Sequence, residues 1–350
     1  MTTNHKKIAI IGPYGSGNLG DEAMLASIIK KFRSNGFQKL YVVGINHRFL
    51  SKEIRHNGGF EFISYFNLPK LFMVLRTVDW IIFGSGCLLK TVSALKLLPV
   101  FILTYFMKKM FLFFGIEVYP MPKSLSYILF KLLNNSGLWV VRTDLSKKIL
   151  IRNGIDGSKI MIVPDVAHLF RLHRKTRNMV DAPIVGINVR PPMIPDWFDK
   201  NSYKNLVIYL VSLILSNLKN QVWFIPMHPK DELFAQEIVN SLNHTSNSVK
   251  ILKYEPSLSN LLNTLRMADI FIGMRLHSLI FAKLLGLKTI AIPYSLKTFI
   301  YANDNHIPMV LPKKNEIKIL LPSKNARRTM VEKEYLDKAF RRLFKTVVAT

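Results

Sequence analysis

The sequence predicts an α/β protein built from two Rossmann-like, doubly wound domains that face each other across a cleft. The chain has 350 residues, of which 49% are hydrophobic and 20% are charged, enough for two domains of roughly 150 residues with sizeable cores. Short apolar runs recur, each followed by a polar turn and a segment of helical period, as in βαβ units around a buried parallel sheet. A polar, basic stretch at residues 171–182 separates two series of such runs and predicts an interdomain linker.

The expected strands form one series in each domain. In the N-terminal domain, residues 1–170, strands are expected at residues 7–12, 39–44, 80–84, 138–142 and 160–163. In the C-terminal domain, residues 183–312, strands are expected at residues 184–190, 221–227, 269–274 and 288–294. Because doubly wound sheets bind ligands at the carboxyl ends of their strands, residues that directly follow a strand are the candidates for a site.

The C-terminal segment, residues 313–350, is rich in Lys and Arg and is expected to form a basic helical tail. On its last helix, four apolar side chains recur at helical spacing: Leu336, Phe340, Leu343 and Phe344. Such a stripe most often packs on its own domain. Contact of the stripe with a membrane surface is the alternative interpretation.

The charge of the chain predicts an anionic partner. There are 49 Lys and Arg against 22 Asp and Glu, a formal net charge of +27, and net charge bears on partners rather than on fold. Nucleic acid is not expected, because no helix-turn-helix, zinc or RNA-recognition motif accompanies the charge. No apolar run reaches the roughly 20 residues of a membrane span. We therefore expect a cytoplasmic protein, with peripheral contact at the inner face of the cell membrane as an option.

The cysteine and histidine pattern points away from disulfides and metals. Cys87 is the single cysteine, so no intramolecular disulfide can form and nothing calls for an oxidising compartment. We expect Cys87 to be a small buried hydrophobic residue. No pair of Cys or His residues has the spacing of metal ligands, and we expect neither a metal nor a cofactor.

A glycine-rich segment follows the first expected strand. In G-P-Y-G-S-G-N-L-G-D-E-A, Gly15, Gly17 and Gly20 match the pattern GxGxxG, which lets a backbone approach an anion at a helix N-terminus. The second strand is not followed by the acidic residue of a dinucleotide site, and the segment lacks the Lys of a Walker loop. A tight turn before a helix is the structural alternative. That alternative does not explain the polar side chains at this strand end: Tyr14, Asn18, Asp21 and Glu22.

A second cluster of candidate residues lies in the C-terminal domain. The expected strand at residues 269–274 leads into Arg275 and His277, and the strand at residues 288–294 is followed by Lys297. Cationic side chains beside a helix N-terminus suit a phosphate or a carboxylate. His228 and Asp231, in M-H-P-K-D-E, could line the same cleft, although a polar loop explains them equally well.

Several of these segments resemble the polysaccharide pyruvyl transferase family. They are G-P-Y-G-S-G-N-L-G-D-E-A, V-V-R-T-D-L-S at residues 140–146, V-G-I-N-V-R at residues 185–190, and above all G-M-R-L-H-S-L-I-F-A at residues 273–282 followed by P-Y-S-L-K. The resemblance spans residues 12–297 in the order of the family. It implies a two-domain fold of the GT-B type, phosphoenolpyruvate as donor, and a sugar of a cell-surface polysaccharide precursor as acceptor, joined to pyruvate as a ketal.

The resemblance also suggests a role for each candidate residue. Arg190 would bind the donor carboxylate, while Arg275, His277 and Lys297 would bind the phosphate, with His277 protonating it as it leaves. Asp21 and Glu22 would face the acceptor, one as the base for the attacking hydroxyl, and three residues would orient the sugar: Tyr14, Asn18 and Arg142. We expect an anionic acceptor, with the sugar on a polyprenyl diphosphate or a nucleoside diphosphate.

The departures from the family pattern all lie in the N-terminal domain. The chain has G-S-G-C-L-L-K at residues 84–90 in place of G-G-G-L and an acid, and R-T-D-L-S at residues 142–146 in place of R-D-x-x-S. It has Y-P-M-P-K at residues 119–123 in place of a glycine-rich stretch. We therefore expect the donor chemistry to be retained and the acceptor side to be altered. A GT-B glycosyltransferase that uses a nucleotide sugar is the alternative function, and a basic nucleic-acid-binding protein ranks below it.

Overall fold

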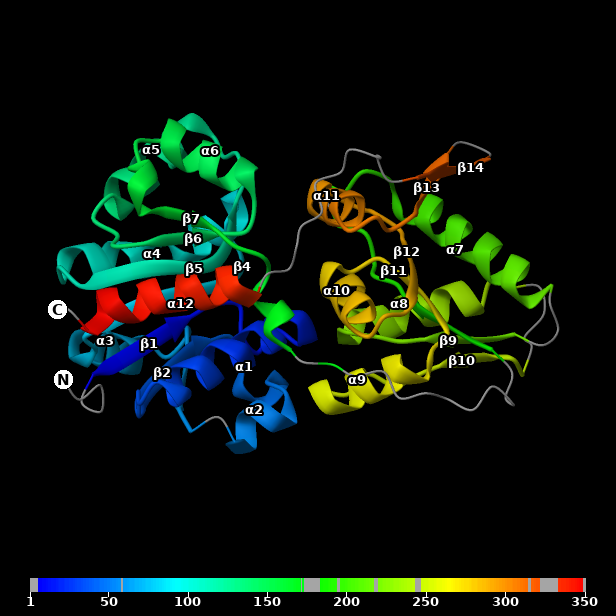
Figure 1. The fold of residues 1–350 in the computed structure, drawn as a ribbon, viewed down its shortest axis with the longest axis horizontal. Helices are drawn as coiled ribbons and strands as arrows, with labels where there is room; N and C mark the ends of the chain where they lie inside the picture. Colours follow the sequence, from blue (N-terminus) through cyan, green and yellow to red (C-terminus); the bar gives the residue numbers. More distant parts are fainter. Residues whose placement is uncertain are drawn as a thin grey trace. The chain divides into compact units, whose positions relative to one another are not determined.

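The computed structural model describes residues 6–57, 59–170, 172, 183–193, 196–216, 220–242, 247–313, 316–321 and 333–348. It divides into two compact units (Figure 1). Unit 1 comprises Met1–Leu169 and Val331–Thr350, and unit 2 comprises Phe170–Met330. Each unit is an α/β structure around one seven-stranded sheet, as the sequence predicts.

The sheet of unit 1 is wholly parallel, with the order β3-β2-β1-β4-β5-β6-β7. Its strands are β1 (Lys7–Ile11), β2 (Lys39–Gly44), β3 (Glu61–Ser64), β4 (Trp80–Leu89), β5 (Met110–Val118), β6 (Trp139–Val141) and β7 (Ile160–Ile162). The five strands expected from the sequence are present, and β3 and β5 are additional. β5 follows an apolar helix with only residues 107–109 between them, and an apolar strand so close to an apolar helix is hard to distinguish from it by periodicity.

Helices cover both faces of this sheet. They are α1 (Leu19–Ser34), α2 (Lys52–Asn57), α3 (Leu68–Thr77), α4 (Thr91–Phe106), α5 (Lys123–Leu133), α6 (Asp144–Arg152) and α12 (Lys333–Val348). The buried sides of α3, α4 and α5 join one apolar core with the sheet. α12 packs beside α1, against side chains of unit 1 that do not belong to this core. Phe113 and Phe114 on β5 show the division, because Phe113 stacks on Phe83 in the first core while Phe114 contacts Phe340 of α12, with ring centroids 4.4 Å apart.

The basic tail is part of the two units and is not a separate segment. β13 (Met309–Lys313) and β14 (Glu316–Leu320) form an antiparallel hairpin that extends the second sheet past the boundary expected at residue 312. α12 returns to unit 1, where Leu336, Phe340 and Leu343 are buried. The ring centroids of Phe344 and Phe32 are 5.1 Å apart. Packing of the stripe on its own domain is therefore confirmed, and the membrane alternative for these side chains is wrong because other side chains already cover them.

Unit 2 repeats the architecture of unit 1, with the strand order β10-β9-β8-β11-β12-β13-β14. Five parallel strands precede the hairpin: β8 (Ile184–Asn188), β9 (Gln221–Phe224), β10 (Val249–Ile251), β11 (Ile270–Gly273) and β12 (Lys288–Ala291). Its helices are α7 (Lys200–Leu215), α8 (Pro229–Val239), α9 (Leu258–Met267), α10 (Leu276–Leu284) and α11 (Leu296–Asp304). All four expected strands are present. The strand order reverses between β8 and β11, the position at which such sheets bind ligands.

The expected linker at residues 171–182 lies outside the described residues, apart from residue 172. Within the described part of the chain, no helix combines the length and the apolar character needed to cross a membrane.

Candidate active site

The point at which the strand order of unit 2 reverses is organised by Asn188, the last residue of β8. Its side chain is fully buried, and its Nδ2 donates to the carbonyl of Ile225 at 2.9 Å. Its Oδ1 accepts a hydrogen bond from the backbone N–H of Arg275 at 3.2 Å. One amide thus ties the ends of β8 and β9 to the first residues after β11. It fixes the position from which the Arg275 side chain and helix α10 start.

The Arg275 side chain is held by a carboxylate on α8. Its Nε and Nη2 donate to the two oxygens of Asp231 at 2.6 and 2.5 Å. The Asp231 side chain is 1% exposed, and the backbone N–H of Met227 donates to it at 3.1 Å. A bidentate pair of this kind fixes the plane of the guanidinium as well as its position. From the sequence, Asp231 could line the cleft or lie in a polar loop. The structure places it in the first turn of α8, and its role as the partner that orients Arg275 is a finding of the structure.

Arg190 and Lys297, far apart in the sequence, meet at the ring of Tyr294. The guanidinium carbon of Arg190 lies 3.9 Å from the ring centroid and the Lys297 Nζ lies 5.7 Å from it. Both distances allow a favourable interaction of the cation with the aromatic ring. Arg190 Nη1 is also 3.0 Å from a carboxylate oxygen of Asp196, and both side chains are nearly buried. Arg190 therefore has a carboxylate partner in this structure, at the place where the sequence predicts that it binds a carboxylate.

Two helix N-termini lie at the same edge of the second sheet. α10 and α11 follow the neighbouring parallel strands β11 and β12, and neither has a side-chain hydrogen bond from its capping residue, Arg275 and Ser295 respectively. The first N–H groups of a helix have no partner within the helix and carry partial positive charge. His277 is the second residue of α10 and is 8% exposed. This edge therefore combines three cationic side chains, a histidine and two helix ends, a set that suits an anion.

In unit 1, the glycine-rich segment after β1 forms a tight turn. Gly15 and Gly17 have φ angles of +72° and +87°, in the left-handed region that favours glycine. A Cβ on Gly15 would lie 2.1 Å from the carbonyl oxygen of Asn46. The backbone N–H of Gly15 donates to Glu22 Oε1 at 2.8 Å. The glycines thus serve a close backbone approach between the loops after β1 and β2.

The polar residues of this turn hold the start of α1 together. Asn18 is the capping residue, accepting from the Gly20 N–H at 3.2 Å and donating to Asp21 Oδ2 at 2.8 Å. Glu22 and Tyr14 are fully buried, and Asp21 is 9% exposed. Burial raises the pKa of Glu22 to about 8, although hydrogen bonds from the backbone N–H groups of Gly15 and Ser51 favour the charged form. Of the two carboxylates predicted to face an acceptor, Asp21 is the more accessible.

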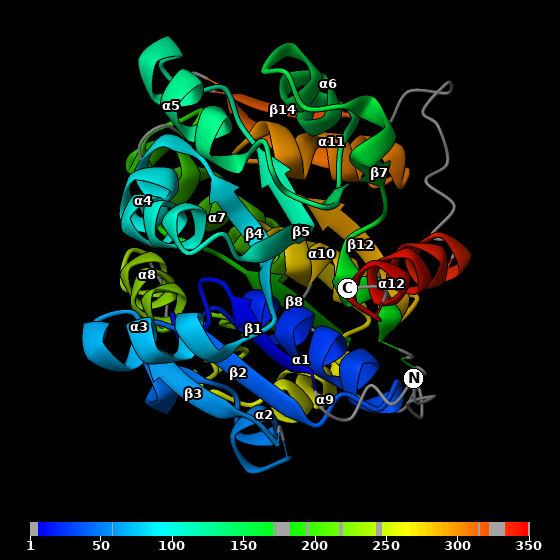
Figure 2. The ribbon, with the colours of Figure 1, turned by 90° about the vertical axis from the view of Figure 1, so that its left-hand side faces the viewer.

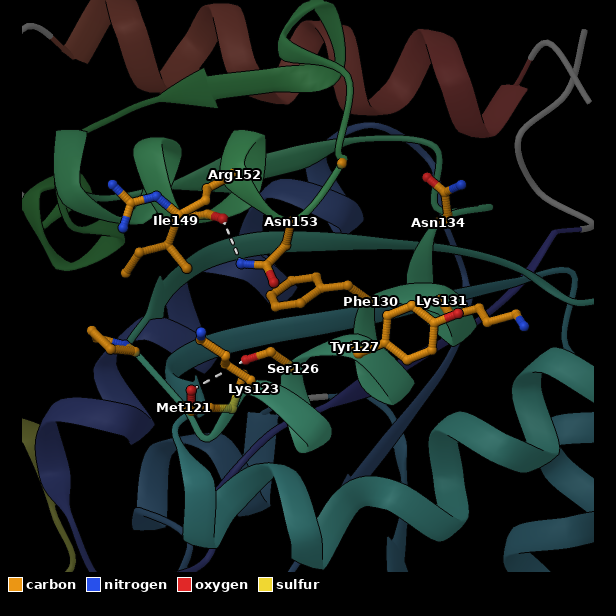
Figure 3. A pocket seen from close by; sticks show the side chains of 12 residues that line it. Met121, Lys123, Ser126, Tyr127, Phe130, Lys131, Asn134, Ile149, Arg152 and Asn153 are labelled. Atoms are coloured by element: carbon orange, nitrogen blue, oxygen red, sulfur yellow. Dashed lines mark hydrogen bonds between the residues drawn. The ribbon is translucent and has the colours of Figure 1, made fainter.

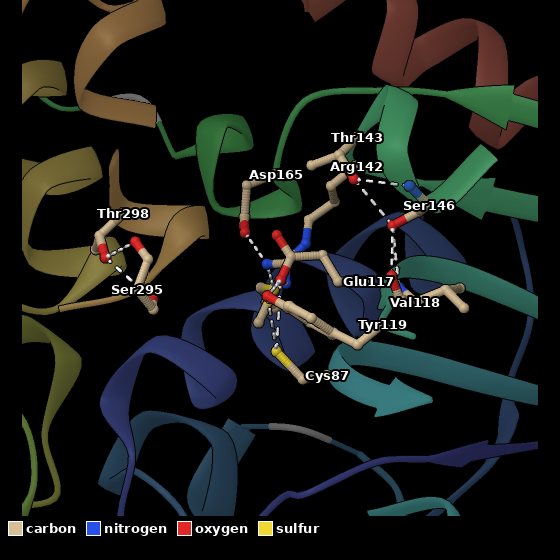
Figure 4. A network of polar contacts seen from close by, with 11 residues as sticks. Cys87, Glu117, Val118, Tyr119, Arg142, Thr143, Ser146, Asp165, Ser295 and Thr298 are labelled. Atoms are coloured by element: carbon tan, nitrogen blue, oxygen red, sulfur yellow. Dashed lines mark hydrogen bonds and ion pairs between the residues drawn. The ribbon is translucent and has the colours of Figure 1, made fainter. Parts of the chain in front are cut away.

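Arg142 lies in a buried network at the carboxyl ends of β4 to β7 (Figure 4). Its Nη2 is 3.1 Å from Glu117 Oε2, and its Nη1 forms a short contact with Asp165. Burial by itself would lower the pKa of Arg142, but Glu117 and Asp165 outweigh it and hold the pKa above its ordinary value. Tyr119 donates to Glu117 at 2.8 Å, and the Cys87 thiol is 3.4 Å from the same oxygen. In the structure Arg142 joins the ends of three strands, and its role in orienting a sugar stays a prediction.

The segment R-T-D-L-S that departs from the family pattern forms the start of α6. Thr143 caps the helix, with its Oγ1 accepting from the Ser146 N–H at 3.1 Å, and Asp144 is in the first turn. Ser146 Oγ in turn accepts from the backbone N–H of Val118 at 3.0 Å. The displaced acid is therefore placed where the helix dipole favours a negative charge.

A pocket of about 630 Å³ opens between α5 and α6 (Figure 3). Three of its lining side chains are basic and none is acidic: Lys123, Lys131 and Arg152. Pro120, Met121 and Lys123, from the segment that replaces the expected glycine-rich stretch, are among its walls. The sequence does not predict this pocket, because most of its walls come from two helices whose packing is not visible in the sequence. Among the described residues, no group of three or more His, Cys, Asp or Glu side chains could hold a metal ion.

The family model for polysaccharide pyruvyl transferases matches residues 18–295. The chain belongs to the polysaccharide pyruvyl transferase family. It is therefore a transferase, and the resemblance found in the sequence is confirmed. The match includes the glycine-rich turn from Asn18 onward, Arg142, Arg190 and the segment with Arg275 and His277. No curated protein sequence matches the chain.

Solved structures with low sequence identity share the fold of this pyruvyl transferase family member. A structure of Anabaena Alr3699/HepE in complex with UDP and glucose is 12% identical, with a TM-score of 0.58, over 98% of this chain and 92% of that chain. The UDP-GlcNAc 2-epimerase of Methanocaldococcus jannaschii is 14% identical, with a TM-score of 0.59, over 95% and 99%. The S. aureus MnaA–UDP structure is 10% identical, with a TM-score of 0.58, over 96% and 89%. The fold is accordingly of the GT-B type, as predicted.

The structure brings together the predicted residues within each unit. Four donor-side residues lie at one edge of the second sheet: Arg190, Arg275, His277 and Lys297. The acceptor-side residues lie after β1 and β6 of the first sheet: Tyr14, Asn18, Asp21, Glu22 and Arg142. The counter-ions of the arginines were not predicted, although Asp231 lies in the first turn of α8, the helix that follows β9, and its place after an expected strand was a usable signal. The cleft between the domains and the assignment of donor and acceptor stay predictions.

Proposed function

We propose that this transferase moves the pyruvyl group of phosphoenolpyruvate to a sugar of a cell-surface polysaccharide precursor, as a ketal. The observation that carries the proposal is the set of Arg190, Arg275 and Lys297 with two helix N-termini at one edge of the second sheet. Phosphoenolpyruvate offers a protein little besides a carboxylate and a phosphate. Both groups are best held by fixed cations and backbone N–H groups.

The chemistry balances without a redox partner. A proton adds to the methylene carbon of the donor, and C2 becomes cationic. One sugar hydroxyl adds to C2, the bond from C2 to the phosphate oxygen breaks, and a second hydroxyl closes the ketal. Of the two hydroxyl protons released, one balances the proton taken up by the methylene carbon, and the other leaves with the phosphate. We propose no cofactor for this reaction.

The residues of unit 2 would handle the donor. Arg275 would contact the phosphate, and Asp231 would keep the guanidinium oriented while it does so. Lys297 adds a charge near the N-terminus of α11, and His277 would donate a proton to the leaving phosphate. Arg190 would bind the donor carboxylate, which would take the position that Asp196 holds at 3.0 Å from Nη1. A positioned acid of this kind contributes on the order of 100- to 10,000-fold.

The residues of unit 1 would handle the acceptor. Asp21 is the proposed base for an attacking hydroxyl, because Glu22 is fully buried and favours its protonated form at neutral pH. Tyr14, Asn18 and Arg142 would act by shaping the turn and the strand ends around the sugar. The basic pocket between α5 and α6 supports an acceptor that carries negative charge, such as a sugar on a polyprenyl or nucleoside diphosphate. We propose that the reaction takes place in the cytoplasm, at the inner face of the cell membrane.

The proposed reaction is tested by incubating the protein with phosphoenolpyruvate and lipid-linked or nucleotide-linked sugars. The expected result is a sugar product that has gained the mass of one pyruvyl group, together with one equivalent of phosphate. Release of phosphate without mass gain, or no reaction with any acceptor, would count against the proposal.

A nucleotide-sugar glycosyltransferase is the second candidate, because several similar structures contain UDP. Thermal melting separates the two, since a ligand that binds the folded state raises the melting temperature. We expect phosphoenolpyruvate to raise it and uridine nucleotides to leave it unchanged. The reverse pattern would favour the glycosyltransferase.

A further inference from the structure

Helix α4 of unit 1 exposes a second apolar stripe. One side of the helix, with Ala94, Leu97 and Phe101, is buried against the sheet. On the other side, four apolar side chains at intervals of three, seven and four residues, which places them on one side of a helix, are exposed: Val92 (58%), Leu95 (52%), Ile102 (36%) and Phe106 (75%). A helix on the surface of a water-soluble domain normally shows polar residues there. The outer side of α4 therefore has the composition of a surface that contacts an apolar partner.

The neighbouring helices α3 and α5 extend this surface. The buried sides of α3, α4 and α5 belong to the same core, so the three helices cover one face of the first sheet, as Figure 2 shows. Further exposed apolar side chains lie on α3 and α5 and just before α3: Phe66, Leu68, Phe72, Met73, Tyr127 and Ile128. Apolar side chains scattered singly over a surface need no explanation, whereas many of them on helices that cover the same face of a sheet indicate an interaction site. We call the exposed side chains of α3, α4 and α5, together with Phe66, the α3–α5 face.

The charge of the α3–α5 face has one sign. The three helices contain no Asp or Glu and carry five basic residues: Lys70, Arg76, Lys96, Lys123 and Lys131. Lys90 directly precedes α4, and Lys108 and Lys109 follow its end. The charge of Lys70 is partly neutralised by an ion pair with Glu61. The Lys109 ammonium group donates hydrogen bonds to two backbone carbonyls. Exposed apolar groups among basic groups are complementary to a lipid surface with anionic head groups.

We propose that the α3–α5 face docks the protein on an anionic lipid membrane. The apolar side chains of α4 enter the boundary between head groups and acyl chains, and the flanking lysines contact lipid phosphates. α4 has 16 residues with Pro99 inside, too short to span a bilayer, so the helix lies on the surface. The apolar stripe of α12 has no part in this contact, because it is buried in unit 1. This inference rests on the proposed location of the reaction and not on its chemistry.

The test is sedimentation of the full-length protein with two kinds of vesicle, one of phosphatidylcholine and the other of equal parts of phosphatidylcholine and phosphatidylglycerol. We expect binding to the anionic vesicles that weakens as salt is raised. A triple variant with Leu95→Gln, Ile102→Gln and Phe106→Gln should bind at least about tenfold more weakly, since each change removes apolar surface from the contact. Because these side chains are exposed, the melting temperature should stay near that of the parent.

A matched control replaces three exposed apolar side chains of unit 2. Tyr209, Leu213 and Leu233 are comparably exposed on α7 and α8, and changing them to Gln should leave vesicle binding unaltered. A second variant, with Lys96→Gln, Lys108→Gln and Lys131→Gln, should lose binding to anionic vesicles and show a weaker dependence on salt.

Two results would overturn the inference. One is equal sedimentation of the parent and the α4 variant, and the other is equal binding of the parent to neutral and anionic vesicles. Conversion of a dimer to a monomer in the α4 variant, with vesicle binding unchanged, would likewise overturn it and assign the face to contact between copies of the chain. Because no donor or acceptor is present in the assay, its outcome does not depend on the proposed reaction.

Discussion

Replacing Arg275 with Ala should destabilise unit 2 as well as impair the reaction. The change leaves the Asp231 carboxylate, which is 1% exposed, without the two hydrogen bonds of 2.5 and 2.6 Å that now hold it. Removing one partner of a buried ion pair costs about 3–5 kcal/mol. The N–H of Met227 and the N-terminus of α8 still favour the carboxylate, so we expect the lower end, about 3 kcal/mol.

The assay has to separate the two units, because a single free energy of unfolding is not defined for a chain whose domains unfold separately. Native-state hydrogen exchange of amides in β8, β9 and β11 reports on unit 2, and amides in β1 and β4 report on unit 1. We expect the opening free energy to fall by about 3 kcal/mol in unit 2 and to stay constant in unit 1. The double variant Arg275→Ala with Asp231→Ala should recover part of the loss, because no buried charge is then unpaired.

The matched control is Arg266→Ala on α9, where the arginine forms a surface hydrogen bond of 2.7 Å with Asn263. This change should cost no more than about 0.5 kcal/mol. Unchanged protection of unit 2 in Arg275→Ala would refute the reasoning, since Asp231 would then not depend on Arg275. Equal losses in the single and double variants would refute it too.

Three further predictions concern the pH dependence of stability, the donor site and the C-terminal helix. Because burial raises the pKa of Glu22 from 4.5 to about 8, the folded chain holds a proton that the unfolded chain releases, and this group's contribution to stability falls as pH rises between those two values. Glu22→Gln should remove a fall on the order of 3–5 kcal/mol between pH about 4.5 and 8, measured as the opening free energy of unit 1 by hydrogen exchange of amides in β1 and β4. Parallel pH profiles of variant and parent would contradict this. His277→Asn should abolish transfer at an unchanged melting temperature, and Lys297→Ala should raise the KM for phosphoenolpyruvate more than it lowers kcat. Near-parental activity of the His277 variant would remove this residue from the donor site, and a loss in kcat alone would reassign Lys297. Phe340→Ala should destabilise unit 1 by about 3–5 kcal/mol, seen as a lower melting temperature; an unchanged temperature would mean that α12 contributes little to the unit.

Much of the fold could be predicted because buried parallel strands leave a clear mark in a sequence. The runs that became β1, β8 and β11 are short, apolar and bounded by polar turns. β5 was missed because it is as apolar as α4 and only three residues separate the two elements. β14 was missed because it lies in a basic segment that was interpreted as a helical tail. Strand pairing brings distant residues together, and no local pattern records which strand is the partner.

The sequence predicted the kinds of residue in the candidate site, but only part of how they are arranged. The position of Arg275 and His277 after a strand was sufficient to place them at the sheet edge, because parallel strands end at one edge. The carboxylates that hold the arginines were not identified, since Asp231 and Asp196 reach them through contacts between separate segments. Glu22 was predicted to face an acceptor; that role stays a prediction, and the structure shows its side chain buried, with a hydrogen bond from the backbone N–H of Gly15.

The sequence by itself determined the fold class, the family and the cationic character of the candidate donor site, because these depend on apolar periodicity and on short motifs. The tertiary structure decided which arginines have carboxylate partners and which apolar stripes remain exposed. α12 and α4 both show apolar residues at helical spacing, yet the stripe of α12 is buried in unit 1 while the outer stripe of α4 is exposed. The physical reason is that burial depends on what packs against a side chain, and chain segments far apart in the sequence supply those contacts.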